Sequence, residues 1–151
     1  MRSSNSSRAK AAGLVLFAAL LLTTGCTQRV VKVDHPFYVM YVEDPDERAL
    51  FRCPDGPNGG CAVDGLPGPT VFAAGANRTY VTVARHPRVG DVPGFRRTDL
   101  GRTEYFYFAR VSNETRGWGD NPERIIGPLT QKEFDDARQR LHLPEFSVKL
   151  R

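Results

Sequence analysis

Hydrophobic positions along this 151-residue chain form one long run near the N-terminus and several short groups further on. The short groups are rich in aromatic and β-branched residues, which favour strands. They predict five strands, at Phe37–Val42, Leu50–Arg52, Val71–Ala74, Tyr80–Arg85 and Glu104–Val111. The last is the most apolar, so we expect it to be central in a sheet.

Turn-forming residues separate these strands. Gly75–Asn77 predicts a turn that joins the third and fourth strands as a hairpin. Glu43–Glu47 predicts another turn, and Pro54–Pro69 is expected to be a loop because it holds five glycines and four prolines. Residues 86–103 and 112–123, the second with the lone Trp118, are expected to be exposed loops.

The C-terminal part has a helical pattern instead. Thr130 and Glu133 have the spacing of a capping box, in which each side chain bonds the other residue's backbone N–H. Phe134, Ala137 and Leu141 follow at helical spacing and form one apolar stripe. The pattern predicts an amphipathic helix over residues 131–141, with Pro144 beyond its end.

Together these elements predict one α+β domain, mainly β, over residues 37–151: a small antiparallel sheet with one C-terminal amphipathic helix. A chain with 40% hydrophobic and 25% charged residues has the composition of a globular protein. Residues 1–25 are expected to be a cleaved signal peptide and residues 26–36 a tether, because the N-terminal pattern differs from the rest.

The N-terminal pattern is that of an export signal. Residues 1–10 are polar and positive, residues 11–22 are apolar apart from Gly13, and small residues follow. As a helix the apolar run would be about 18 Å long, whereas the hydrocarbon core of a bilayer is about 30 Å thick. A cleaved signal is therefore favoured over a permanent membrane span.

The signal ends in Leu22-Thr-Thr-Gly25-Cys26, which resembles the lipobox of bacterial lipoproteins. In that family the cysteine thiol receives a diacylglycerol and the chain is cut before it, so the resemblance implies lipidation at Cys26. The usual aliphatic residue three places earlier is Thr23 here. The alternative is an ordinary signal peptide followed by a chance cysteine.

Thr27 follows the cysteine, where an Asp would favour retention in the inner membrane of Gram-negative lipoproteins. The resemblance thus implies a protein of the cell envelope, anchored in a membrane by its N-terminal lipid. In a Gram-negative host it would be the outer membrane, with the domain facing the periplasm.

The remaining cysteines, Cys53 and Cys61, are an even pair in an oxidising compartment. The turn formers between them can fold the chain back, which predicts a disulfide. A redox pair or a metal site is the alternative, but the spacing is not C-x-x-C.

Charge excludes a nucleic-acid partner. The net charge is +4, but Arg2, Arg8 and Lys10 lie in the leader, which leaves 18 basic and 17 acidic groups for the rest. A locally basic loop around Arg85 and Arg88 could bind lipid headgroups or an acidic partner, or could simply be solvated.

Alternation in the strand at residues 104–111 separates its aromatic residues. Phe106 and Phe108 share one face and are expected in the core. Tyr105 and Tyr107 share the other, where they would be half-buried or form a binding surface together with Arg85 and Arg88.

Catalytic and ligand-binding motifs do not appear in the sequence. After Cys26 the serines Ser112 and Ser147 lie outside any nucleophile-elbow motif, and no glycine-rich nucleotide loop occurs. His35, His86 and His142 do not have metal-ligand spacing, and Asp44-Pro-Asp46-Glu47 lacks the order of a calcium loop. We therefore expect no enzymatic activity, no cofactor and no metal.

The C-terminal third carries a second resemblance. A tyrosine-rich strand from Tyr105, followed by Ile125-Ile-Gly-Pro-Leu-Thr-Gln-Lys-Glu-Phe134, is similar to the ending of an uncharacterised family of small bacterial lipoproteins. The match covers about 40 residues and implies a fold but no activity.

Three functions follow as hypotheses. The first is a non-catalytic envelope lipoprotein that binds another, unknown envelope protein. The alternative is an inhibitor that protects against an envelope-directed hydrolase such as lysozyme, to whose inhibitors the stretch from Ala74 to Tyr80 is faintly similar. An enzyme with an unrecognised site is the third.

Overall fold

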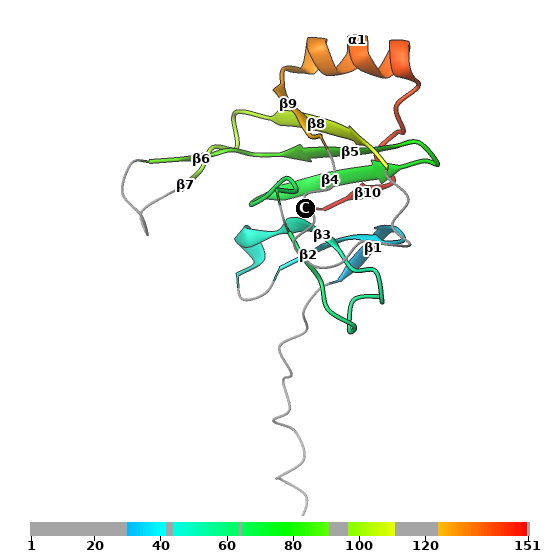
Figure 1. The fold of residues 1–151 in the computed structure, drawn as a ribbon. Coiled ribbons are helices and arrows are strands. Elements are labelled where there is room, and N and C mark those ends of the chain that lie inside the picture. The colour runs from blue at the N-terminus through cyan, green and yellow to red at the C-terminus, as the bar shows by residue number, and fades with distance from the viewer. Residues whose placement is uncertain (1–29, 42–43, 64, 91–96, 111–123, 151) are drawn as a thin grey trace, which may run out of the picture.

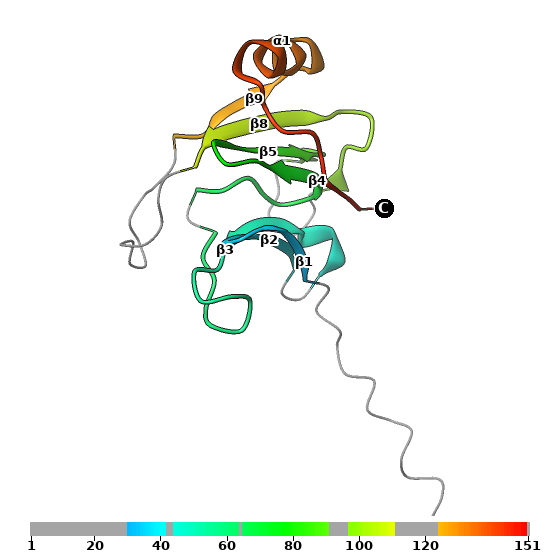
Figure 2. The same ribbon diagram turned by 90° about the vertical axis from the view of Figure 1, so that its right-hand side faces the viewer.

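The computed structural model describes residues 30–41, 44–63, 65–90, 97–110 and 124–150. Figures 1 and 2 show three layers: helix α1 (Gln131–Leu141), a five-stranded sheet below it, and a three-stranded sheet below that. The predicted class, α+β with mainly β structure and one C-terminal helix, is confirmed. The predicted signal peptide, Cys26 and the loop over residues 112–123 lie outside the described residues.

The small sheet has the order β1-β2-β3 and is antiparallel, with β1 (Val31–Asp34), β2 (Phe37–Met40) and β3 (Ala49–Arg52). A short 3-10 helix, η1 (Pro45–Glu47), joins β2 to β3 and is capped by Asp44, which accepts a bond from the Asp46 N–H. Strand β1 corrects the predicted tether over residues 26–36. Its alternation of valine with polar residues spans four residues, too short a pattern to distinguish from a linker.

The large sheet is antiparallel throughout and has the order β10-β4-β5-β8-β9. Its strands are β4 (Val71–Ala76), β5 (Tyr80–Arg85), β8 (Glu104–Ala109), β9 (Ile126–Leu129) and β10 (Val148–Lys149). The predicted β4–β5 hairpin is confirmed, and the Asn77 side chain closes its turn by accepting bonds from the N–H groups of Thr79 and Tyr80. Strand β8 is interior, between β5 and β9, as its apolar sequence predicts.

Apolar side chains of the two sheets face each other and form the main core. They include Phe37, Val39, Leu50, Val81, Val83 and Phe108, each fully buried. Phe106 also lies in this cluster, so both phenylalanines of β8 are core residues as predicted. The rings of Phe37 and Phe108 meet edge to face with 5.5 Å between centroids, and this contact joins the two sheets.

Helix α1 covers the opposite face of the large sheet. Both bonds of the predicted capping box are present at Thr130 and Glu133, and Phe134 and Ala137 are buried. The helix ends at His142, whose left-handed backbone lets its N–H bond the Arg138 carbonyl. Beyond it the chain returns to the large sheet at Gly75, where a Cβ atom would stand 2.0 Å from the Glu145 carbonyl oxygen.

Four short strands were not predicted besides β1. The expected loop over residues 86–103 contains a two-stranded ribbon, β6 (Arg88–Val89) paired with β7 (Arg97–Thr98). Strand β10 also has two residues, and β9 contains Gly127 and Pro128, which argue against a strand. These strands are set by pairing with a neighbour that is distant in sequence, not by their own pattern.

Candidate functional site

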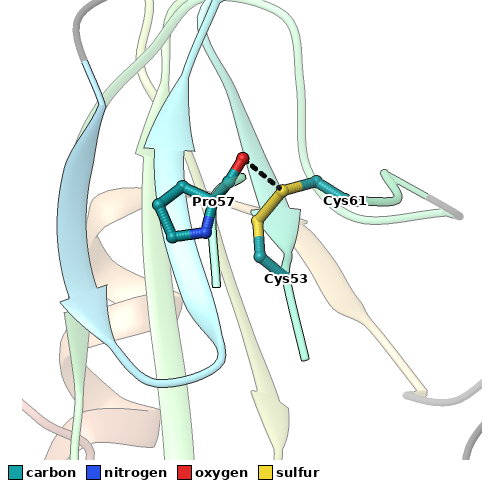
Figure 3. Close-up of a disulfide and its surroundings, with 3 residues drawn as sticks. All are labelled: Cys53, Pro57 and Cys61. Carbon is teal, nitrogen blue, oxygen red and sulfur yellow. Dashed lines mark hydrogen bonds between the residues drawn. A yellow bond between two sulfur atoms is a disulfide. The ribbon is translucent and has the colours of Figure 1, made fainter. Parts of the chain in front are cut away.

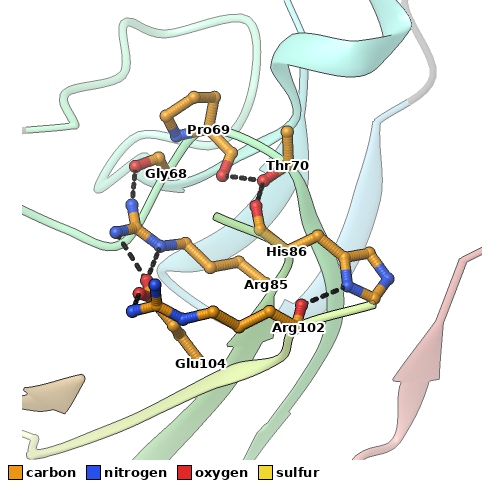
Figure 4. A network of polar contacts seen from close by, with 7 residues as sticks. All are labelled: Gly68, Pro69, Thr70, Arg85, His86, Arg102 and Glu104. Carbon is orange, nitrogen blue, oxygen red and sulfur yellow. Dashed lines mark hydrogen bonds and ion pairs between the residues drawn. The ribbon is translucent and has the colours of Figure 1, made fainter. Parts of the chain in front are cut away.

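Arg85, a predicted binding residue, belongs to a buried ionic network at the end of the large sheet (Figure 4). Its Nε and Nη2 atoms donate to the same oxygen of Glu104, at 3.0 and 2.9 Å, and Nη1 bonds the Gly68 carbonyl. Arg102 donates to the other Glu104 oxygen at 2.7 Å. Glu104 is 6% exposed. Because Arg85 binds both Glu104 and the Gly68 carbonyl, the network holds the loop before β4 against β5 and β8.

Tyr105 and Tyr107 lie on the other face of the large sheet, against α1. Tyr105 stacks on Phe134 with 5.0 Å between ring centroids, and its hydroxyl bonds Gln131. Burial, together with the negative charge of Asp135, raises the pKa of Tyr105 above its ordinary value. The structure therefore does not bring these tyrosines together with Arg85 and Arg88 as one surface.

The predicted Cys53–Cys61 disulfide is present, with a Cα–Cα distance of 4.3 Å (Figure 3). Cys53 is fully buried, and the loop folds back so that the backbones of Arg52 and Ala62 exchange two hydrogen bonds. The Cys61 sulfur lies 3.8 Å from the Pro57 carbonyl oxygen, a contact and not a hydrogen bond because a disulfide sulfur has no hydrogen. This loop packs on the outer face of the small sheet, beside Tyr38 and Met40.

Arg110 is another arginine that binds backbone oxygens, and its role was not predicted from the sequence. Arg110, after β8, donates to the carbonyls of His35 and Asn77 and pairs with Asp34 at 2.5 Å. Its guanidinium also lies over the Phe37 ring. It joins the β1–β2 turn to the large sheet, and no local pattern signals such a contact between distant segments.

A cleft of about 430 Å³ opens where η1, β4 and the β6–β7 ribbon meet. Figure 1 shows η1, β6 and β7 on the same side of the molecule. A volume of this size is within the range of small-molecule sites. The lining residues are Asp44, Asp46, Arg48, Thr70, Phe72, His86, Arg88, Arg97, Thr98 and Leu100.

One wall of the cleft is an aromatic stack. The rings of Phe72 and His86 lie nearly parallel, with 4.4 Å between centroids. The His86 Nδ1 atom is 2.8 Å from the Arg102 carbonyl oxygen, which requires a proton on Nδ1. Nε2 is then the ring atom left to meet a ligand.

Basic groups form the second wall. The Arg88 Nη1 atom donates to Glu47 at 3.0 Å and Nη2 to the Asp46 carbonyl at 3.5 Å, while Nε is buried without a hydrogen-bond partner among the described residues. Arg97 is exposed on β7 and makes no ion pair within the described part of the chain. Of the four residues predicted to form a binding surface, only Arg88 lines the cleft. Phe72 and Arg97 line it as well and were not among those four. The basic loop in the sequence indicated the region of the cleft but not its full lining.

The described residues hold no group of three or more His, Cys, Asp or Glu side chains arranged to bind a metal ion. In the same part of the chain no helix has the length and apolar character needed to cross a bilayer.

Comparisons of the chain with protein-family models, with curated proteins and with solved structures gave no match.

Proposed function

We propose that this protein is a lipoprotein of the bacterial cell envelope, anchored by acyl chains on Cys26, that acts without catalysis by binding another envelope component. The observation that carries the proposal is the sequence Leu22–Cys26 at the end of a charged and then apolar leader. Each buried CH₂ of an acyl chain contributes about 0.8 kcal/mol to membrane binding, so two or three chains give a stable anchor.

The short distance between Cys26 and the folded domain supports anchoring close to the bilayer. Four residues separate Cys26 from the first residue of β1, Val31, and the five steps from one Cα atom to the next span at most about 18 Å. The layer that contains β1 would then be near the membrane, and α1, in the opposite layer, would face away from it (Figure 2). The Cys53–Cys61 disulfide agrees with an oxidising compartment outside the cytoplasm.

The state of the polar side chains supports binding over catalysis. Both oxygens of the buried Glu104 carboxylate are held by arginines, one by Arg85 and the other by Arg102. The cleft is lined by arginines, aspartates, threonines, Leu100 and the stacked rings of Phe72 and His86. Such a lining is suited to holding a ligand.

The anchor is tested with Cys26→Ser, expressed as the full chain in a bacterial host. We expect the variant to lack the mass of the lipid and to stay uncleaved at this site, so that it keeps the mass of the leader. Thr23→Leu is the matched control: it restores the usual aliphatic residue and should mature like the original chain. Equal mass and equal detergent partition of Cys26→Ser and the original chain would refute the anchor.

The choice of membrane is tested in a Gram-negative host with Thr27→Asp. Fractionation should find the original chain in the outer membrane and the variant in the inner membrane. Thr27→Ser is the control and should remain in the outer membrane. Recovery of the original chain in the inner membrane would contradict the sorting part of the proposal.

A further inference from the structure

We propose that the cleft between η1, β4 and the β6–β7 ribbon binds a small molecule that carries a single carboxylate next to a flat apolar group. The inference concerns the folded domain alone and does not depend on lipidation at Cys26. It rests on two features of the cleft lining: the exposed guanidinium of Arg97 and the aromatic stack of Phe72 and His86.

The arginine wall supplies the anion site. Arg97 extends from β7, is exposed and makes no ion pair among the described residues, whereas Arg88 beside it already donates to the Glu47 carboxylate and to the Asp46 carbonyl. A guanidinium donates two parallel hydrogen bonds to a carboxylate, and such charge-assisted bonds are about twice as strong as neutral ones. A carboxylate of a ligand would therefore pair with Arg97, and the positive charge of Arg88 nearby would add to the attraction.

The acidic residues of the cleft limit the charge of the ligand. Asp44 and Asp46 stand against the three arginines of the lining, and Glu47 already holds one face of Arg88. The lining thus has a formal charge of about +1 when His86 is neutral. A singly charged carboxylate is matched by this charge, whereas a phosphate dianion would be repelled by the aspartates.

The aromatic wall supplies the second half of the site. Phe72 and His86 are stacked, so they present a flat surface, and Leu100 is a large apolar side chain that is 73% exposed beside them. A planar ligand group would stack on this wall and cover Leu100. Leu100 does not pack into any of the core clusters of the described residues. Its exposed position at the rim of the cleft is therefore consistent with contact to a ligand.

The backbone around His86 is held in place before any ligand arrives. Thr70 has φ of +70°, a left-handed conformation that costs energy for a β-branched residue. Its hydroxyl lies against the His86 carbonyl, and the His86 ring is fixed from the other side by the Arg102 carbonyl (Figure 4). Strained backbone conformations of this kind are concentrated at binding and active sites, where the surrounding structure holds them in place.

The test measures ¹⁹F NMR binding of 4-fluorobenzoate to the full chain in detergent micelles, with 4-fluorobenzamide as the neutral probe of the same shape. We expect saturable binding of the benzoate and at least about tenfold weaker binding of the benzamide, because the amide has no charge to pair with arginine. Arg97→Gln should weaken benzoate binding about tenfold, and Arg78→Gln, exposed at the far β4–β5 turn, should leave it unchanged.

Two comparisons decide the outcome. Thermal unfolding of Arg97→Gln should match that of the original chain, so that weaker binding reports the site and not the fold. Phe72→Leu should weaken benzoate more than acetate, because acetate has no ring to stack. Equal binding of benzoate and benzamide, equal binding by the Arg97 and Arg78 variants, or tighter binding of phenyl phosphate than of benzoate would overturn the proposal.

Discussion

Two groups of arginines lie near the ends of strands β5 and β8 and in the β6–β7 ribbon. They differ in what their guanidinium groups bind. Arg85 and Arg110 donate to Glu104, to Asp34 and to backbone carbonyls of segments that are distant in sequence, and Arg102 donates to Glu104 two residues further along the chain. Arg88 follows Arg85 by three positions and Arg97 by twelve, but both of them line a cleft. The first group stabilises the fold, whereas the second is available for a ligand.

The difference teaches that a cluster of basic residues in a sequence is not by itself a binding surface. Arg85 and Arg88 are separated by two residues, yet one faces a buried carboxylate and the other an exposed one, Glu47. The side chain of Glu104 is 8% exposed and that of Glu47 is 54% exposed. Burial of the partner, not proximity in sequence, separates the two roles.

The sharpest way to test this comparison is to remove the buried carboxylate. Glu104→Gln leaves Arg85 and Arg102 without a charge partner, and breaking a buried ion pair costs about 3–5 kcal/mol. Since both arginines keep some contact with water, we expect the low end, about 3 kcal/mol, in the free energy of unfolding measured with urea. A loss below about 1 kcal/mol would show that the network is not structural.

Arg110→Gln is expected to have the next largest effect. It removes the ion pair with Asp34 and the bonds to the His35 and Asn77 carbonyls, and bonds to charged groups contribute about 1.5–3 kcal/mol each. Because water reaches part of this site, we expect a total loss of about 2 kcal/mol in urea unfolding. Arg140→Gln on the exposed side of α1 is the control and should change stability by less than about 0.5 kcal/mol.

Glu47→Gln acts on the other group of arginines. The Glu47–Arg88 pair is exposed, so its loss should cost about 0–1 kcal/mol of stability. The same change releases Nη1 of Arg88 and removes a negative charge, so binding of 4-fluorobenzoate should become tighter. A large loss of stability with no change in binding would place Arg88 with the structural arginines.

The smallest effect concerns the carboxylate of the capping box, Glu133, which has no arginine partner among the described residues. Glu133 accepts bonds from the Thr130 N–H and hydroxyl, which lower its pKa below the ordinary value. The folded chain therefore holds this proton less tightly than the unfolded chain, and the stabilisation is present above the ordinary glutamate pKa and lost as the pH falls through the folded pKa. Urea unfolding at pH 6 and pH 3 should show a smaller acid loss for Glu133→Gln than for the original chain; equal losses would contradict this.

Elements with a strong local pattern could be predicted from the sequence. The α1 boundaries follow from the capping box and the apolar stripe, and the core positions of Phe106 and Phe108 follow from alternation in β8. The pairing of Cys53 with Cys61 followed from the even cysteine count and the turn formers between them. In each case the signal and its structural cause lie within about a dozen residues.

Features made by contacts between distant segments could not be predicted. Strand β10 forms because Val148 pairs with Ala74, and the cleft forms because Phe72 in β4 meets His86 after β5. In both pairs, the sequence around one residue does not indicate which residue it will contact. The basic loop indicated the region of the cleft. The prediction that Tyr105 and Tyr107 share a surface with it was wrong, because both face α1 on the opposite side of the sheet.

If the chain is anchored to a membrane as we propose, the order of strands in the large sheet has a consequence for contacts between crowded copies. One end strand, β10, is only two residues long, and the other, β9, contains Pro128, which has no N–H to offer a neighbouring chain. Short and proline-containing end strands are poor templates for pairing between molecules. A protein confined to a surface meets copies of itself far more often than one free in solution, and these two ends would keep such encounters from growing into shared sheets.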